Sequence, residues 1–275
     1  MIILLASEPQ TGKSTVAKKF IDRYSGDCQW VLTPELLQQG ERVGFEAVSQ
    51  TGERAILAHQ SLVTSPVIIG SHQYHVDTSI IDRFYTKPLL AAIANPPGVF
   101  VLDEIGLIQR QSPNFTPAVA AAFAHNLNLL ALISTRDKWT ARYRNHPRAA
   151  TLAVTPATRN QLPDLLVTMF HGLELSQRLN PTQRQALLSL TRRYARQTNL
   201  ILLDKLYGHA VRYLLEARLR PSGHNQYQIQ GDHGSYTAGL RPHVHCDCDL
   251  FNGRGQFANH GGDCSHVMTL RLSQL

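Results

Sequence analysis

The chain has 275 residues, of which 43% are hydrophobic, and a formal net charge of +7. This length and composition suffice for one large core, or for one core and a small module. No apolar run approaches the roughly 18 residues of a membrane-spanning helix, and the apolar opening MIILLA lacks the features of a signal peptide. We therefore expect a cytoplasmic protein with reduced thiols and no membrane partner.

The first predicted elements are a buried strand over residues 2–6 and a helix from Ser14 to about Tyr24. The segment between them, SEPQTGKST, ends in the Gly-Lys-Ser of a phosphate-binding P-loop. In such a loop the backbone amides and the lysine hold phosphates, and the hydroxyl binds Mg²⁺. The first glycine of the pattern is replaced by Ser7, which is strained if this position requires a positive φ. The expected nucleotide-binding residues are Pro9, Gln10, Thr11, Gly12, Lys13, Ser14 and Thr15.

Alternating strands and helices are predicted from there to about residue 170. A Thr51-Gly52 turn between two alternating runs indicates one hairpin. The other short apolar runs have the character of buried parallel strands. We therefore predict an α/β fold with a mostly parallel sheet covered by helices on both faces. The expected strands lie near 67–69, 99–102, 128–134 and 151–155, and the expected helices near 79–94, 117–126, 136–144 and 158–170.

The strand near 99–102 ends in Asp103-Glu104, about 90 residues after the P-loop. An acid at this place in a P-loop NTPase holds Mg²⁺ together with the loop hydroxyl, here Asp103 with Ser14. The next acid, Glu104, is suited to orient and partly deprotonate an attacking water. We expect Lys13, Asp103 and Glu104 to be the catalytic residues.

Residues 171–220 form a basic helical linker in this interpretation. Asn180 is the expected N-cap of a first helix and Pro181 its first residue. A second helix places Leu203, Leu206 and Ala210 on one face. Between 178 and 220 there are nine basic residues against Asp204 and Glu216. This excess suits a phosphate-rich partner such as DNA or RNA, or else arginines on the solvated face of ordinary helices.

Residues 221–275 contain Cys246-x-Cys248 and, after a gap of 15 residues, Cys264-x-His266. Thiolates and imidazole in two close pairs are typical of a structural tetrahedral Zn²⁺ site. A disulfide within Cys-x-Cys would be strained. The segment before the cysteines reads as a hairpin and the segment after them as a short helix, which predicts a small ββα-like module stabilised by zinc. His243, His245 and His260 are alternative ligands.

Residues 1 to about 170 resemble the small P-loop nucleoside-triphosphatases known as cancer-related NTPases, described from thermophiles and animals. The resemblance rests on GFEAVSQTGERAILA (44–58), VLDEIGLIQR (101–110) and VTPATR, which ends at Arg159. It implies slow Mg²⁺-dependent hydrolysis of nucleoside triphosphates such as ATP or GTP, and it adds Arg159 to the nucleotide-binding residues. Ser7 and Gln10 replace glycines of the family loop, which predicts slow turnover.

The C-terminal residues resemble the SWIM zinc-finger family, whose pattern is C-x-C, a variable gap and C-x-H. That resemblance implies zinc binding by Cys246, Cys248, Cys264 and His266, and contact with DNA or with a protein partner. The predicted domains are thus an NTPase domain (1–170), the linker (171–220) and a SWIM-type module (221–275). Two alternatives stay open: a nucleotide-sensing adaptor with little turnover, and a kinase-like phosphoryl transferase acting on a nucleoside or RNA end.

Overall fold

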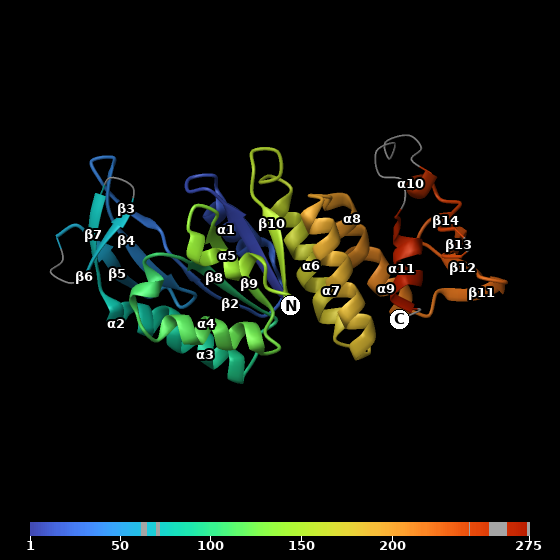
Figure 1. Cartoon of the computed structure of the whole chain (residues 1–275), viewed down its shortest axis with the longest axis horizontal. Coiled ribbons are helices and arrows are strands. Elements are labelled where there is room, and N and C mark those ends of the chain that lie inside the picture. The colour runs from blue at the N-terminus through green and yellow to red at the C-terminus, as the bar shows by residue number, and fades with distance from the viewer. Residues whose placement is uncertain (62–64, 70–71, 242, 253–262, 274–275) are drawn as a thin grey trace. The chain divides into compact units, whose positions relative to one another are not determined.

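The computed structural model describes residues 1–61, 65–69, 72–241, 243–252 and 263–273. The chain divides into two units, residues 1–163 and residues 164–275 (Figure 1). Within the described ranges, no helix has both the length and the apolar character needed to cross a bilayer. The predicted domain boundaries, after residue 170 and after residue 220, remain predictions.

The first unit is built on a ten-stranded sheet with the order β10-β1-β9-β8-β2-β4-β5-β7-β6, and β3 pairs with β4. The strands from β10 to β2 are parallel, whereas all pairings from β2–β4 onward are antiparallel. The parallel half comprises β1 (Ile2–Ser7), β2 (Cys28–Leu32), β8 (Val99–Ile105), β9 (Leu129–Ser134) and β10 (Ala149–Ala153). The antiparallel half comprises β3 (Glu35–Gln38), β4 (Glu41–Ser49), β5 (Arg54–His59), β6 (Ser65–Ile69) and β7 (His72–Val76).

The prediction of a mostly parallel sheet is therefore wrong, because the sheet is mixed. The strand expected near 67–69 is β6, which pairs antiparallel with β7 rather than parallel within the central sheet. The hairpin at Thr51-Gly52 is confirmed as β4–β5, with Gly52 at a φ of 80°. Three strands, β2, β3 and β7, were not predicted. These strands consist largely of half-buried or exposed residues, which give a weaker signal than a continuous apolar run.

Helices cover both faces of this sheet. Along β1, Ile2 and Leu4 belong to the core cluster that includes residues of α3 and α4, and the intervening Ile3 is equally buried on the opposite face. The helix α1 (Lys13–Arg23) buries Phe20 outside that cluster. The helix predicted at 79–94 is α2 (Thr78–Ile81), a π-helical turn (Asp82–Thr86) and α3 (Lys87–Ala94) in succession. The next helices are α4 (Phe115–Ala124) and α5 (Ala141–Arg144).

The second unit begins with helices. They are α6 (Leu162–Ser176), α7 (Pro181–Arg196), α8 (Leu200–Lys205), a π-helical turn (Leu206–Ala210) and α9 (Val211–Leu215). The predicted cap of α7 is confirmed, since Asn180 and Gln183 form a reciprocal capping box. Gly172 of α6 lets the π-helical turn approach closely, because a methyl group there would lie 2.9 Å from Tyr207. The Tyr207 hydroxyl also bonds Thr191 of α7 at 2.6 Å.

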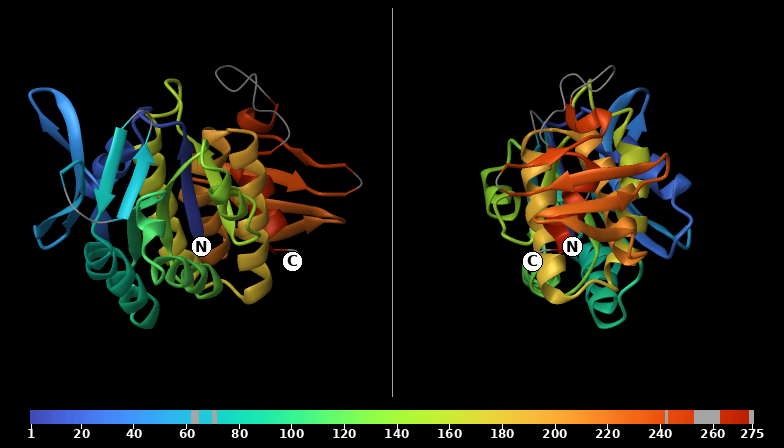
Figure 2. Two further views of the ribbon diagram at one scale, coloured as in Figure 1. Left: turned by 60° about the vertical axis from the view of Figure 1, so that its left-hand side comes forward. Right: turned by 90° about the vertical axis from the view of Figure 1, so that its right-hand side faces the viewer.

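The same unit contains a four-stranded antiparallel sheet, shown by its orange and red strands in Figure 2. Its strands are β11 (Leu219–Gly223), β12 (Gln226–Gln230), β13 (Ser235–Gly239) and β14 (His245–Cys246), followed by α10 (Asp249–Asn252) and α11 (Ser265–Ser273). The predicted hairpin is β12–β13 and the predicted helix is α11, whereas β11 and α10 were not predicted. Tyr213 of α9 shares a buried cluster with Ile229, Val267 and the three C-terminal cysteines, so this small sheet shares its core with the helix before it.

Candidate functional site

The loop after β1 closes around the ammonium group of Lys13. Lys13 begins α1, and its side chain is buried. Its Nζ atom donates to the carbonyl oxygens of Ser7 at 3.4 Å and Glu8 at 3.2 Å, and to the Ser7 hydroxyl at 3.3 Å. Burial lowers the Lys13 pKa, although Glu104 and Asp103 oppose this shift. The loop thus holds a positive charge at the N-terminus of a helix, where anions bind favourably.

The backbone of this loop explains which glycine replacement matters. Ser7 is the last residue of β1 and does not have a positive φ, so it carries no left-handed strain. Its hydroxyl donates to the Glu8 carbonyl at 3.0 Å and is also hydrogen bonded to the Thr11 hydroxyl. The left-handed positions are Gln10, with a φ of 63°, and Gly12, with a φ of 99°. Gln10 is therefore the substitution that costs backbone energy.

Two carboxyl groups face the loop from the end of β8. Asp103 is 3% exposed, and its carboxylate accepts hydrogen bonds from the Ser14 hydroxyl and, at 3.4 Å, from the Thr33 amide. Burial raises the Asp103 pKa to about 6. Burial and the charge of Asp103 raise the Glu104 pKa to about 7. A base whose pKa lies near neutral pH is well matched to accepting a proton from water.

The oxygen atoms of Ser14 and Asp103 form a donor set that suits Mg²⁺. A hydroxyl and a carboxylate that already share a hydrogen bond lie close enough to bind one cation. Bound there, the cation would neutralise phosphate charge. The sequence-predicted residues Lys13, Ser14, Asp103 and Glu104 are thus brought together by the fold.

A set of hydrogen-bonded polar side chains beside Asp103 was not predicted from the sequence. Thr33, just after β2, donates its hydroxyl hydrogen bond to the Asp103 carbonyl and lies 2.8 Å from the Tyr85 hydroxyl. Gln109 donates to the Thr33 hydroxyl at 3.3 Å, and its Oε1 atom has no partner among the described residues. These residues fix the backbone at the acid pair. Only their tertiary contacts reveal them, because β2 carries no motif.

The two arginines near the loop differ in their surroundings. Arg159 follows β10, and a methyl group on Gly12 would lie 3.9 Å from its Cδ atom. Its exposed guanidinium makes no hydrogen bond or ion pair with a described residue, so it is free to contact a nucleotide beside Gly12. Arg136 instead pairs with Glu8 at 2.7 Å, and both side chains are well exposed. A surface pair of this kind contributes little to stability.

Comparison with known proteins identifies the family of this fold and loop. A family model described as NTPase matches residues 2–167. The chain belongs to the NTPase family. It is 34% identical over 166 residues to nucleoside-triphosphatase THEP1 of Natranaerobius thermophilus, across 60% of this chain and 93% of that protein. The THEP1 protein of Aquifex aeolicus is 28% identical across 60% of this chain and 97% of its own length.

A solved structure agrees with the family assignment. The crystal structure of THEP1 from Aquifex aeolicus superposes with a TM-score of 0.53 and 25% identity, and covers 60% of this chain and 96% of that chain. This NTPase is therefore an enzyme of the nucleoside-triphosphatase class. The family match ends at residue 167, within α6, so it does not extend over the rest of the second unit.

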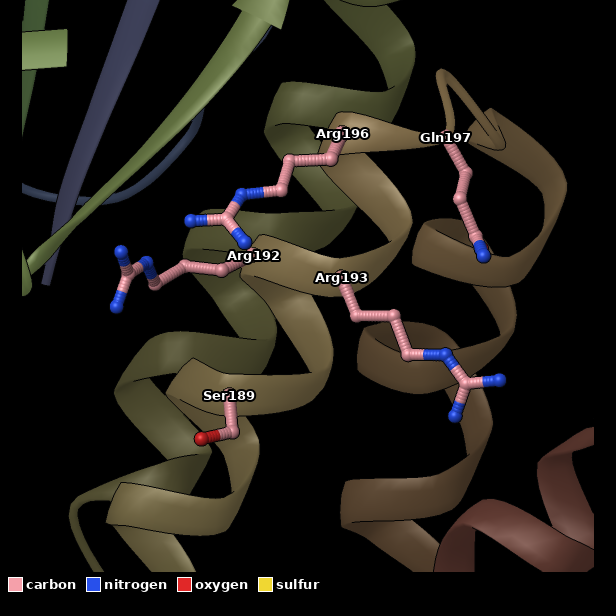
Figure 3. A pocket seen from close by; sticks show the side chains of 5 residues that line it. All are labelled: Ser189, Arg192, Arg193, Arg196 and Gln197. Carbon is pink, nitrogen blue, oxygen red and sulfur yellow. The ribbon is translucent and has the colours of Figure 1, made fainter. Parts of the chain in front are cut away.

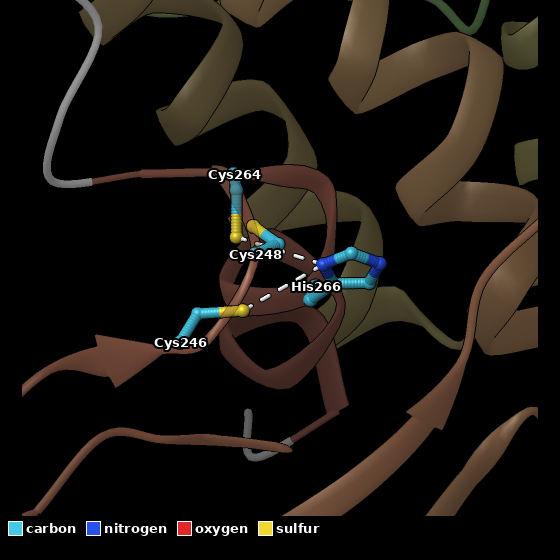
Figure 4. Close-up of side chains that lie close together, drawn as sticks. All are labelled: Cys246, Cys248, Cys264 and His266. Atoms are coloured by element: carbon cyan, nitrogen blue, oxygen red, sulfur yellow. Dashed lines mark hydrogen bonds between the residues drawn. The ribbon is translucent and has the colours of Figure 1, made fainter. Parts of the chain in front are cut away.

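The C-terminal unit of this NTPase brings together the four predicted metal ligands. One ligand atom from each of Cys246, Cys248, Cys264 and His266 lies within 4.8 Å of the others (Figure 4). The Nδ1 atom of His266 faces the Sγ atoms of Cys246 at 3.6 Å and Cys264 at 3.9 Å. All four residues are buried, and none of the cysteines forms a disulfide. Three thiols and one imidazole are a donor set that suits tetrahedral Zn²⁺.

Aromatic and acidic neighbours hold this cluster in place. The His266 ring is stacked on Tyr236 at 4.2 Å between centroids, and Tyr213 lies nearly parallel to it at 5.9 Å. Gly231 leaves space beside the ring, since a methyl group there would lie 3.0 Å from the His266 Nε2 atom. Asp263, next to Cys264, accepts hydrogen bonds from Tyr194 at 2.9 Å and from Arg271 at 3.1 Å.

The alternative ligands have other surroundings. His243 is exposed, His245 bonds the His243 carbonyl through Nδ1 at 3.1 Å, and neither belongs to the cluster. His260 lies outside the described residues. Cys28 stands on β2 in the first unit, where burial raises its pKa to about 12. It is therefore a protonated thiol, separate from the C-terminal cluster.

Proposed function

We propose that this NTPase hydrolyses nucleoside triphosphates with Mg²⁺ at the P-loop, and that its C-terminal unit contains a structural zinc site and contacts a nucleic acid or a protein. The observation that carries the first part is the convergence of Lys13, Ser14, Asp103 and Glu104 at one end of the sheet. Lys13 and the backbone amides of the loop hold the phosphates. Ser14 and Asp103 hold the cation, and Arg159 contacts the nucleotide.

Glu104 is the general base in this proposal. Its pKa of about 7 keeps a large fraction ionised at neutral pH, while burial makes the carboxylate a stronger base than a solvated one. It orients water and accepts its proton as the water attacks the γ-phosphorus atom. The bond from that phosphorus atom to the bridging oxygen breaks, so the products are a nucleoside diphosphate and phosphate.

Phosphate release tests these roles. We expect Glu104→Gln to keep nucleotide binding and to slow phosphate release about 10²–10⁴-fold, the contribution typical of a general base. Lys13→Ala should abolish nucleotide binding, because it removes the charge enclosed by the loop. Glu41→Gln, which changes an exposed acid at the start of β4, is the matched control. Undiminished release by Glu104→Gln would remove the general-base assignment.

The same measurement separates the two alternative functions. A nucleotide-sensing adaptor would bind nucleotide tightly and release little phosphate in the parent protein. A phosphoryl transferase would release phosphate slowly by itself and consume the triphosphate faster when a nucleoside or an RNA end is supplied. The acid pair could serve water or a hydroxyl acceptor alike, so the effect of an added acceptor decides between hydrolysis and transfer.

The zinc proposal rests on the buried Cys₃His cluster and is tested by metal content. We expect one Zn²⁺ per chain, held by Cys246, Cys248, Cys264 and His266. Metal affinity would then contribute directly to the folding of the C-terminal unit. Cys264→Ser should lose the metal and leave nucleotide binding intact, and Cys28→Ser should change neither. Metal retained in full by Cys264→Ser would overturn the ligand set.

A further inference from the structure

The outer face of α7 carries a row of polar side chains that the zinc and nucleotide sites do not use. Its members recur at intervals of three and four residues, which places them on one side of a helix. The opposite side of α7, with Leu187, Leu190 and Tyr194, is buried. A pocket of about 360 Å³ is lined by Ser189, Arg192, Arg193, Arg196 and Gln197 (Figure 3). We call this surface the α7 groove.

The basic residues between 178 and 220 differ in whether their side chains have hydrogen-bond or ion-pair partners. Arg212 and Arg218 both bind the carboxylate of Asp232. Arg184 donates to the carbonyl oxygens of Gln177 and Leu179 in the turn after α6, at 3.1 and 2.9 Å. Within the described part of the chain, the guanidinium groups of Arg192 and Arg196 make no hydrogen bond or ion pair. Two like charges four residues apart on a helix repel each other.

The local sequence offers these two arginines no compensating charge. No Asp or Glu occurs between Glu174 and Asp204, so α7 contains no acidic residue. Arg193 lies 3.6 Å from Asp263, but Asp263 already accepts shorter hydrogen bonds from Tyr194 and Arg271. In Figure 3, Ser189, Arg192 and Arg196 extend to one side of α7, and Arg193 and Gln197 extend to the other. Guanidinium groups therefore flank the groove on both sides.

We propose that the α7 groove binds the phosphodiester backbone of a nucleic acid. This inference rests on the proposed function, because it identifies the partner of the C-terminal unit and its contact surface. Guanidinium groups donate paired hydrogen bonds that match phosphate oxygens. The row from 189 to 197 is about 12 Å long, which favours an extended chain of phosphates over a single anion. The lining contains no aromatic side chain for base stacking, so contact with the backbone should be independent of base sequence.

Fluorescence anisotropy with the whole zinc-loaded chain of 275 residues tests this proposal. The probes are labelled oligo-dT, its RNA counterpart and a DNA duplex, each titrated at several salt concentrations. The test variant is R192Q/R196Q. The matched control is R178Q/R220Q, which removes the same charge at two exposed positions of the same unit outside the groove. Neither control side chain makes a hydrogen bond or ion pair with a described residue.

The parent should bind at least one of the three probes, and binding should weaken steeply with salt. R192Q/R196Q should bind that probe about tenfold or more weakly, and its slope of log K against log salt should be smaller by about 1.4 on single strands, the loss of two phosphate contacts. R178Q/R220Q should stay near the parent. Phosphate release and zinc content should not change in either variant.

Three results would overturn the proposal. Equal losses in both double variants would indicate a diffuse charge effect, and no loss in R192Q/R196Q would exclude the groove. Absence of oligonucleotide binding together with binding to phosphatidylserine vesicles would assign these arginines to a membrane surface. The phosphate-release and zinc measurements on the same preparations separate these outcomes from a failure of the proposed function. The groove can fail while hydrolysis and zinc binding persist.

Discussion

The hydrogen bond between Tyr194 and Asp263 should stabilise the C-terminal unit by a measurable amount. Tyr194 is fully buried on α7, and its hydroxyl donates to the Asp263 carboxylate at 2.9 Å. Asp263 is 4% exposed and precedes the metal-ligand candidate Cys264. A hydrogen bond to a charged acceptor contributes about 1.5–3 kcal/mol. Tyr194→Phe should therefore lower the free energy of unfolding of this unit by about that amount.

A double-mutant cycle isolates this interaction from the rest of the packing. In an Asp263→Ala background the Tyr194 hydroxyl has lost its acceptor, so Tyr194→Phe should then cost close to nothing. The expected coupling energy is about 1.5–3 kcal/mol, since the two residues are in direct contact. Arg271 also loses a partner in Asp263→Ala, but it does so in both arms of the cycle, and its contribution cancels.

Amide hydrogen exchange by mass spectrometry gives the free energies unit by unit. The whole chain need not unfold in one step, because it has two units. Protection of α7 and α11 amides reports the second unit, and Tyr194→Phe should speed their exchange about 10- to 150-fold. Trp30 and Trp139 both lie in the first unit, so their fluorescence is an internal control that should not change. A coupling energy below about 0.5 kcal/mol would refute the reasoning.

Three further predictions concern the loop, the base and the zinc ligand. Gln10→Gly should raise the melting temperature, followed by tryptophan fluorescence, by about 1–3 °C. The substitution relieves left-handed strain of about 1–2 kcal/mol, which exceeds the entropic cost of a glycine, about 0.5–1 kcal/mol. A lower melting temperature would contradict this prediction. The kcat/KM for hydrolysis should level off above pH 7, because the ionised form of Glu104 is the base and its pKa is about 7. It should fall more steeply below pH 6, where Asp103 also becomes protonated, and Glu104→Gln should lack the limb near pH 7. Gly231→Ala should weaken zinc binding about 10–100-fold in a chelator competition, because the added methyl group would lie 2.9 Å from Tyr236 and 3.0 Å from His266 and must displace these stacked rings. Gly223→Ala, whose methyl group meets nothing closer than 3.7 Å, should bind zinc normally, and equal losses in both would exclude the steric argument.

The local patterns of the sequence were sufficient to predict both parts of the P-loop site, the lysine loop and the acid pair. A buried apolar strand followed by Gly-Lys-Ser predicts a loop around Lys13, and an apolar strand that ends in Asp103-Glu104 predicts acids at the sheet's carboxyl edge. Parallel strands align these edges, so the two motifs meet although about 90 residues separate them. The Cys-x-Cys and Cys-x-His pairs likewise predict one cluster, because each pair brings its two ligands close within a few residues.

The direction of the outer strands could not be read from local patterns. The run around residue 67 has the apolar character of a central parallel strand, yet β6 is at the edge of the sheet and antiparallel to β7. The backbone of a strand is compatible with either pairing, and the connection to its neighbour decides between them. The same is true of β2, whose half-buried residues give no clear period but which joins the parallel and antiparallel halves.

The family, the loop lysine, the acid pair and the metal-ligand candidates could all be predicted, because each depends on residue types at short, fixed spacing. The fold was needed to locate the left-handed strain at Gln10 rather than Ser7. It also gave Asp103 its contacts with Thr33, and separated the paired arginines from Arg192 and Arg196. The physical reason is that backbone strain, burial and charge pairing depend on groups far away in the chain, and a linear pattern does not specify which of those groups meet.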